Sequence, residues 1–155
     1  MTIGIAGRAD KHRQVVASHL QPLLTDLTAL ALNGKQSHWH LTGRSFLPVH
    51  EQLDRIVDDA RGWADDVAER AVALGFPVDG HPAAVATSEL PPTPDGFVDG
   101  DKVLRVTEEQ LRRAIATARE GLEELGELDL VTQDLVIGIL HGLEKHLWMV
   151  QAQLV

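Results

Sequence analysis

The sequence predicts an all-α fold, in which four long helices form a bundle with one long connection between the second and the third. Apolar residues recur at steps of three and four along four stretches, which is the period of an amphipathic helix. Strand-favouring residues are scarce, since the chain has no Tyr and only three Phe among its 155 residues. Prolines and glycines gather between residues 75 and 99, where the helical pattern stops.

The first two helices are predicted over residues 10–36 and 45–74. In the first, leucines carry the apolar stripe, and Pro22 either bends the helix or stands in its first turn. In the second, Ser45 is a good N-cap residue, and Gly75 ends the helix. Both stretches carry an apolar stripe on one face, as the helices of a bundle do.

The second half of the chain begins with the proline-rich stretch 75–99, which is long enough to run the length of a bundle. Within it we expect one short helical turn near residues 83–86. Two further helices are predicted over 100–126 and 129–153, with Asp129 as the cap of the last. Two helices, a long crossover and two more helices form the plan of a ferritin-like bundle. We expect a single domain over residues 1–155, with a short tail at 1–10.

Composition excludes several classes of protein. The chain has no Cys, so it has no disulfide, thiolate metal site or cysteine nucleophile. No run of apolar residues spans a membrane, and the first residues do not resemble a cleaved signal, so we expect a cytoplasmic protein. The net charge of −9 disfavours contact with nucleic acid and suits the attraction of cations.

The side chains that suggest chemistry form two pairs on the second predicted helix, His50 with Asp54 and Asp65 with Glu69. Each pair is spaced i,i+4 and therefore lies on one helix face, one turn apart. The four residues flank the apolar stripe instead of lying within it. Imidazole and carboxylate ligands together suit iron, manganese or zinc, and bridging carboxylates hold two metal ions close together. His38, at the end of the first helix, offers a further imidazole.

One chain cannot close a single site with both pairs, because Asp54 and Asp65 are about 16 Å apart along a helix that rises 1.5 Å per residue. Positions 50 and 69 have the same midpoint as positions 54 and 65. An antiparallel copy of the same helix therefore sets His50 opposite the partner's Glu69, and Asp54 opposite the partner's Asp65. The pattern predicts a two-fold contact with two identical sites.

Two segments, KQSHWHLTGRSFLPVHEQLD and DDVAER, closely resemble the Dps family of miniature ferritins, and the helix plan, including LEKHLWMVQ near the end, resembles it over the whole chain. The resemblance implies a hollow dodecamer with ferroxidase centres at its two-fold interfaces. Fe²⁺ is oxidised there, preferably by hydrogen peroxide, and is stored inside as a ferric mineral, so that DNA is protected from hydroxyl radicals. It implies five ligands: His38, His50 and Asp54 from one subunit, Asp65 and Glu69 from its neighbour.

The resemblance also implies roles around the site. Trp39 would lie against it, as an electron donor or as interface packing, and Lys35 would pair with a carboxylate at the interface. His40 stands where the family usually has Asn, and either supports the site or adds a contact to the metal. Asp129 and Asp134 match the family's pore through which iron enters, with Glu127 a lesser candidate.

Other functions compete with this reading. A ferritin with its di-iron site inside one bundle needs Glu-x-x-His on its helices, and no Glu here precedes a His by three residues. A nucleoid protein that coats DNA with little ferroxidase activity needs a basic face, and near the N-terminus only Arg8, Lys11 and Arg13 provide one, so we do not expect DNA binding. A helical scaffold without metal leaves the paired ligands unexplained. We interpret Asp58, Asp59 and Asp66 as solvated charges, and His141 and His146 as structural.

Overall fold

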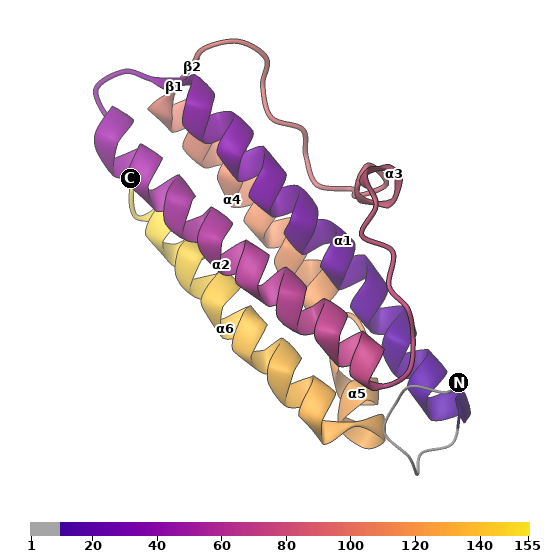
Figure 1. The fold of residues 1–155 in the computed structure, drawn as a ribbon. Helices are drawn as coiled ribbons and strands as arrows, with labels where there is room; N and C mark the ends of the chain where they lie inside the picture. The colour runs from indigo at the N-terminus through magenta and orange to yellow at the C-terminus, as the bar shows by residue number, and fades with distance from the viewer. Residues whose placement is uncertain (1–9) are drawn as a thin grey trace.

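The computed structural model describes residues 10–155, so Arg8 and most of the tail expected at 1–10 lie outside this part. The predicted all-α bundle is confirmed, and its helices lie side by side along one long axis (Figure 1). Four long helices form it: α1 (Asp10–His40), α2 (Phe46–Ala73), α4 (Gly100–Arg119) and α6 (Leu130–Gln151). The connections contain two short helices and two short strands: α3 (Pro82–Val85), α5 (Leu122–Leu128), β1 (Leu41–Thr42) and β2 (Val98–Asp99).

Helix α1 runs without a break past Pro22, so it does not begin near Gln21, and it extends four residues beyond the predicted end. A proline inside a helix removes one backbone hydrogen bond. Here Leu20, Leu23 and Leu24, around the proline, are buried in the core, and this packing holds the helix together. By length and composition α1 could cross a membrane, but more than half of the apolar stretch is buried inside the bundle, which is usual for a core helix.

Helix α2 has nearly the predicted bounds, and Ser45 is its N-cap residue as predicted. The side chain of Ser45, however, makes no capping hydrogen bond. The backbone closes the first turn instead, since the amide of Phe46 donates to the carbonyl of Gly43 and that of Val49 to the carbonyl of Ser45, each at 3.2 Å. The last residues of α1 and the first of α2 are therefore joined by a tight turn.

The third predicted helix is wrong as one element, because it ends at Arg119 and α5 follows as a separate helix. Gly121 has a φ of 73°, in the left-handed region, and the imidazole of His19 packs where a side chain at this glycine would stand. The break places α5 beside the start of α6. Asp129 caps α6 as predicted, accepting a hydrogen bond from the amide of Val131 at 3.2 Å.

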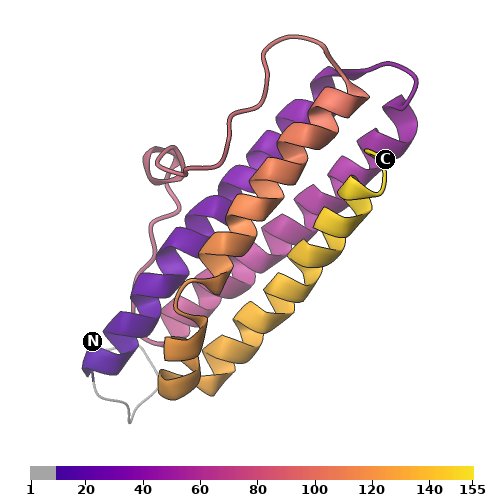
Figure 2. The ribbon, with the colours of Figure 1, turned by 180° about the vertical axis from the view of Figure 1, so that it is seen from behind.

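The proline-rich segment carries the chain along the outside of α1 and back to the other end of the bundle (Figures 1 and 2). The short turn expected near 83–86 is present as α3. At the far end β2 pairs with β1 in parallel, with Leu41 opposite Val98. Asp99 then caps α4 by accepting a hydrogen bond from the amide of Lys102. The crossover thus ends beside the last turn of α1.

The core is built from the predicted apolar stripes, which are buried along the middle of all four long helices. Two glycines allow close contacts. A Cβ at Gly34 would lie 2.7 Å from the side chain of Val57, and one at Gly142 would lie 2.2 Å from the ring of Trp63. At Gly138, by contrast, a Cβ would meet nothing within 4 Å.

Candidate metal centre

Three of the predicted ligands come together where the end of α1 meets the start of α2. The ligand atoms of His38, His50 and Asp54 all lie within 4.8 Å of one another. His38 stands in the last turn of α1, and the spacing of His50 and Asp54 puts both on one face of α2. Among residues 10–155 this is the one group of three or more such side chains close enough to hold a metal ion.

The two imidazole rings are stacked, with their centroids 3.6 Å apart and their planes at 23°. Phe46 extends the stack, since its ring centroid lies 4.8 Å from that of His50. Each histidine directs Nδ1 towards the other's backbone carbonyl oxygen, at 3.3 Å for His50 and 3.4 Å for His38. A hydrogen on Nδ1 leaves the lone pair on Nε2, which can then bind a metal ion.

The carboxylate of Asp54 is the charged centre of the group. Lys35, one turn before His38 on α1, donates a hydrogen bond to its Oδ1, and Nδ1 of His38 lies 3.1 Å from the same oxygen. The hydrogen bond from Lys35 is the main cause that holds the pKa of Asp54 below its ordinary value. The carboxylate is therefore ionised at neutral pH, as a metal ligand must be.

Burial favours the neutral form of His38, the form that binds a metal ion. The side chain is almost fully buried, and desolvation is the main cause that lowers the pKa of its imidazole, although Asp54 opposes the change. The imidazole is therefore neutral at pH 7. Two imidazoles with one carboxylate suit a borderline divalent cation better than a hard cation such as Mg²⁺.

Asp65 and Glu69 are not brought to this group. Both are exposed on α2, about three and four turns beyond Asp54, and the helical period puts them on the same side as His50 and Asp54. Within one chain the second pair lies open to solvent. This arrangement agrees with the geometric argument that one chain cannot close the site with both pairs.

The neighbouring aromatic residues differ in position. Trp39 is 65% exposed, so most of its side chain is open to solvent within one chain. His40 does not join the ligand group: its Nδ1 lies 3.1 Å from the amide of Gln36, and its ring edge meets Phe97. His40 therefore links α1 to the end of the crossover.

Of the residues predicted for the pore, Asp129 is 2% exposed and binds the guanidinium of Arg70 at 2.5 Å. It also accepts a hydrogen bond from Thr132. Asp134 and Glu127 are exposed. Asp129 therefore holds α2 against the start of α6, whereas Asp134 and Glu127 face solvent.

Two pairings differ from what the sequence predicted. Lys35 was expected to pair with a carboxylate at the interface, and within the chain it meets Asp54. Asp59, expected to be a solvated charge, instead accepts a hydrogen bond at 2.7 Å from Nε2 of the buried His146. Nδ1 of the same ring lies 3.1 Å from the amide nitrogen of Gln52. No sequence signal links these residues, which lie on different helices.

The ferritin-like domain family matches residues 17–155 of the chain. The chain is 38% identical over 153 residues to a DNA protection during starvation protein of Mycolicibacterium smegmatis, a match that covers 97% of this chain and 82% of that protein. A solved structure of Dps from Microbacterium arborescens in the high iron form has a TM-score of 0.92 at 32% identity, covering 97% of this chain and 99% of that one. A tetragonal form of Mycobacterium smegmatis Dps also has a TM-score of 0.92, at 34% identity over 99% of this chain and 93% of that one.

Proposed function

Because this chain belongs to the Dps family of ferritin-like proteins, we propose that it is a ferroxidase that oxidises Fe²⁺ and stores the ferric product in a hollow homo-oligomeric shell. Iron storage and DNA protection are the general functions of this family. The observation that carries the specific proposal is the group of His38, His50 and Asp54 at one edge of the bundle. Two imidazoles and an ionised carboxylate bind Fe²⁺ and leave positions open for further ligands.

The remaining ligands come from a second subunit in this proposal. Asp65 and Glu69 are exposed on the ligand side of α2, and an antiparallel copy of that helix brings the partner's pair to the first pair. Large apolar side chains are also exposed nearby, at Leu32, Phe46 and Leu47, as expected of a surface that is covered in the assembly. Each two-fold contact then contains two complete sites.

The chemistry follows from holding two Fe²⁺ ions together. Each ion gives one electron to hydrogen peroxide, the O–O bond breaks, and both oxygen atoms leave as water or hydroxide. A single Fe²⁺ supplies only one electron and releases a hydroxyl radical, so pairing the ions suppresses the radical. Asp54 and the partner's carboxylates offset the charge of the ferric ions.

The shell itself is proposed to be a dodecamer located in the cytoplasm, in or near the nucleoid. Cations reach its interior through pores whose acidic side chains raise their local concentration. Asp134 is our candidate for such a side chain, because it is exposed, whereas Asp129 is buried against Arg70. Direct DNA binding is not part of the proposal, because the net charge is −9.

The test adds Fe²⁺ and then hydrogen peroxide to the assembled protein without oxygen, and follows ferric absorbance and particle mass. The double variant His50→Ala with Asp54→Ala is expected to oxidise Fe²⁺ at the protein-free rate. Asp66→Asn, an exposed acid on another side of α2, is the matched control and is expected to behave as the wild type. Equal rates in the double variant and the wild type, or a native mass of only two chains, contradict the proposal.

The relatives named for DNA protection favour a second candidate, a protein that condenses DNA with little ferroxidase activity. A gel-shift series at increasing salt separates the two. Protein that coats DNA retards it at low salt, with an affinity that falls steeply as salt rises. The iron-oxidising shell is expected to leave the DNA unshifted.

A further inference from the structure

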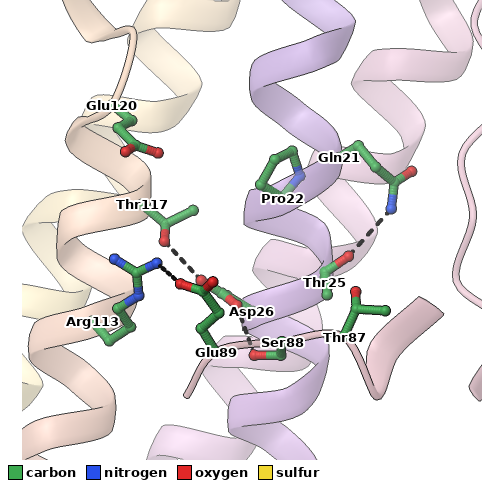
Figure 3. Close-up of a pocket in the computed structure, with 10 residues that line it drawn as sticks. All are labelled: Gln21, Pro22, Thr25, Asp26, Thr87, Ser88, Glu89, Arg113, Thr117 and Glu120. Atoms are coloured by element: carbon green, nitrogen blue, oxygen red, sulfur yellow. Dashed lines mark hydrogen bonds and ion pairs between the residues drawn. The ribbon is translucent and has the colours of Figure 1, made fainter. Parts of the chain in front are cut away.

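A polar pocket of about 340 Å³ lies far from the metal centre, between α1, the crossover and the end of α4 (Figure 3). Thr25 and Asp26 of α1 form its floor, Thr87 and Ser88 of the crossover one wall, and Thr117 of α4 the other. A volume of this size accepts a small organic molecule. Neither the proposed iron chemistry nor the predicted contact along α2 uses these residues.

Asp26 is the unusual member of the pocket, because its carboxylate is 6% exposed and meets only neutral donors. Ser88 Oγ donates to Oδ1 and Thr117 Oγ1 donates to Oδ2, each at 2.7 Å, as Figure 3 shows. Across residues 10–155, no Lys, Arg or His lies within ion-pair distance of it. A buried carboxylate without a cation is costly, and an ionised carboxylate can accept about four hydrogen bonds. Asp26 therefore keeps free acceptor positions for a cationic ligand, beyond the hydroxyl group on each of its oxygens.

The rest of the lining is suited to an ammonium group on a short carbon chain. Glu89 and Glu120 add negative charge at the exposed rim, and Arg113, the one cation of the lining, is engaged by Glu89. The ring of Pro22 and the methyl groups of the threonines offer apolar contact. A bare metal ion suits the pocket less, since no three acidic or imidazole groups here lie close enough together to hold one.

We propose that this pocket binds a small aliphatic amine, with one ammonium group on the carboxylate of Asp26. The ammonium donates charge-assisted hydrogen bonds to the free positions of the carboxylate, and its carbon chain lies along Pro22 and Thr25. A ligand held there contacts α1, α4 and the crossover together. The site is independent of iron oxidation, so either proposal can fail without the other.

The experiment titrates the assembled protein with 1,4-diaminobutane in a calorimeter, with 1,4-butanediol as the uncharged probe. The diamine is expected to bind saturably at one site per chain, and the diol is expected not to bind. Asp26→Asn is expected to weaken diamine binding about tenfold or more, the usual loss for a hydrogen bond to a charged group. Glu109→Gln removes the same charge from an exposed position on α4, and is expected to leave binding unchanged.

A second variant guards against misfolding of Asp26→Asn. Thr87→Phe fills the pocket from an exposed position on the crossover and leaves Asp26 intact, so it is expected to abolish binding while circular dichroism and native mass stay the same. Three results overturn the proposal: no saturable binding to the wild type, equal weakening by Glu109→Gln and Asp26→Asn, or full binding by Thr87→Phe. Equal losses in Asp26→Asn and Glu109→Gln would mean that the diamine is attracted to the overall negative charge of the protein and not to Asp26.

Discussion

The ammonium of Lys35 on α1 donates a hydrogen bond to the carboxylate of Asp54 on α2, beside the imidazole of His38. The lysine side chain is one quarter exposed and the aspartate side chain 40% exposed, so the pair lies at the edge of the bundle. Lys35 thus occupies one of the two carboxylate oxygens of Asp54. An iron ion at the proposed site would compete with this ammonium for the negative charge of the carboxylate.

Replacement of Lys35 by Met is expected to raise the pKa of Asp54 towards its ordinary value, because the main cause of the lowering is lost. At pH 7 the carboxylate stays ionised in both proteins. The variant should therefore bind Fe²⁺ more tightly without oxygen, since no ammonium competes for the carboxylate. A pH titration followed by carbon-detected NMR measures the pKa of Asp54. An Fe²⁺ titration without oxygen measures the affinity for Fe²⁺.

Lys102→Met, an exposed lysine on α4, is the control for the change in net charge. It is expected to alter neither the pKa of Asp54 nor the affinity for Fe²⁺.

The lowered pKa of Asp54 also predicts how the stability of the protein depends on pH. A lowered pKa for Asp54 stabilises the native state above the ordinary value, and this contribution is lost as the pH falls through the lowered value. Lys35→Met should move that loss to higher pH. An unchanged titration of Asp54 would contradict the assigned cause.

The buried His146 is expected to matter for stability, whereas His141 on the same helix is not. His146 is 4% exposed and lies between Gln52 and Asp59 of α2. His146→Ala leaves a cavity and an unsatisfied amide, which together cost about 2–4 kcal/mol in the free energy of unfolding. His141→Ala, at an exposed position, should change it by less than about 0.5 kcal/mol. Chemical denaturation at one protein concentration compares the two.

The helices and the core were predictable because both depend on short-range pattern. The apolar period of α2, for example, gave bounds of 45–74 against an observed Phe46–Ala73, and its stripe at Leu53, Ile56 and Ala60 is buried. The i,i+4 spacing likewise placed His50 and Asp54 on one face. These features need only the helical repeat and the fact that apolar faces pack together.

Contacts between helices were not predictable in the same way. The bond between Asp59 and His146 joins residues 87 positions apart, and nothing in the sequence near either one indicates the other. The break at Gly121 was not predictable, because the apolar period continues across it and a helix tolerates an interior glycine at a cost of about 1 kcal/mol. Such features depend on which side chains meet after packing.

Two glycines of α6 are expected to respond to alanine in opposite directions. At Gly142 the new Cβ would lie 2.2 Å from the ring of Trp63, so Gly142→Ala should lower the free energy of unfolding by about 1–3 kcal/mol. At Gly138 nothing lies within 4 Å, so Gly138→Ala should raise it by about 0.5–1 kcal/mol through better helix propensity. Thermal and chemical denaturation of both variants test the pair. Equal changes would mean that Trp63 moves aside freely.

Asp129 and Asp134 are expected to separate stability from iron uptake. Asp129→Asn leaves the partly buried guanidinium of Arg70 without its charge partner, and should lower the free energy of unfolding by about 3 kcal/mol. Asp134→Asn should leave stability unchanged, because the side chain is exposed. On the proposed route for iron, the same change should slow uptake several-fold at low salt, where acidic pores attract cations most strongly. Denaturation curves and ferric absorbance under limiting Fe²⁺ measure the two effects, and normal uptake by Asp134→Asn would exclude this residue from the route.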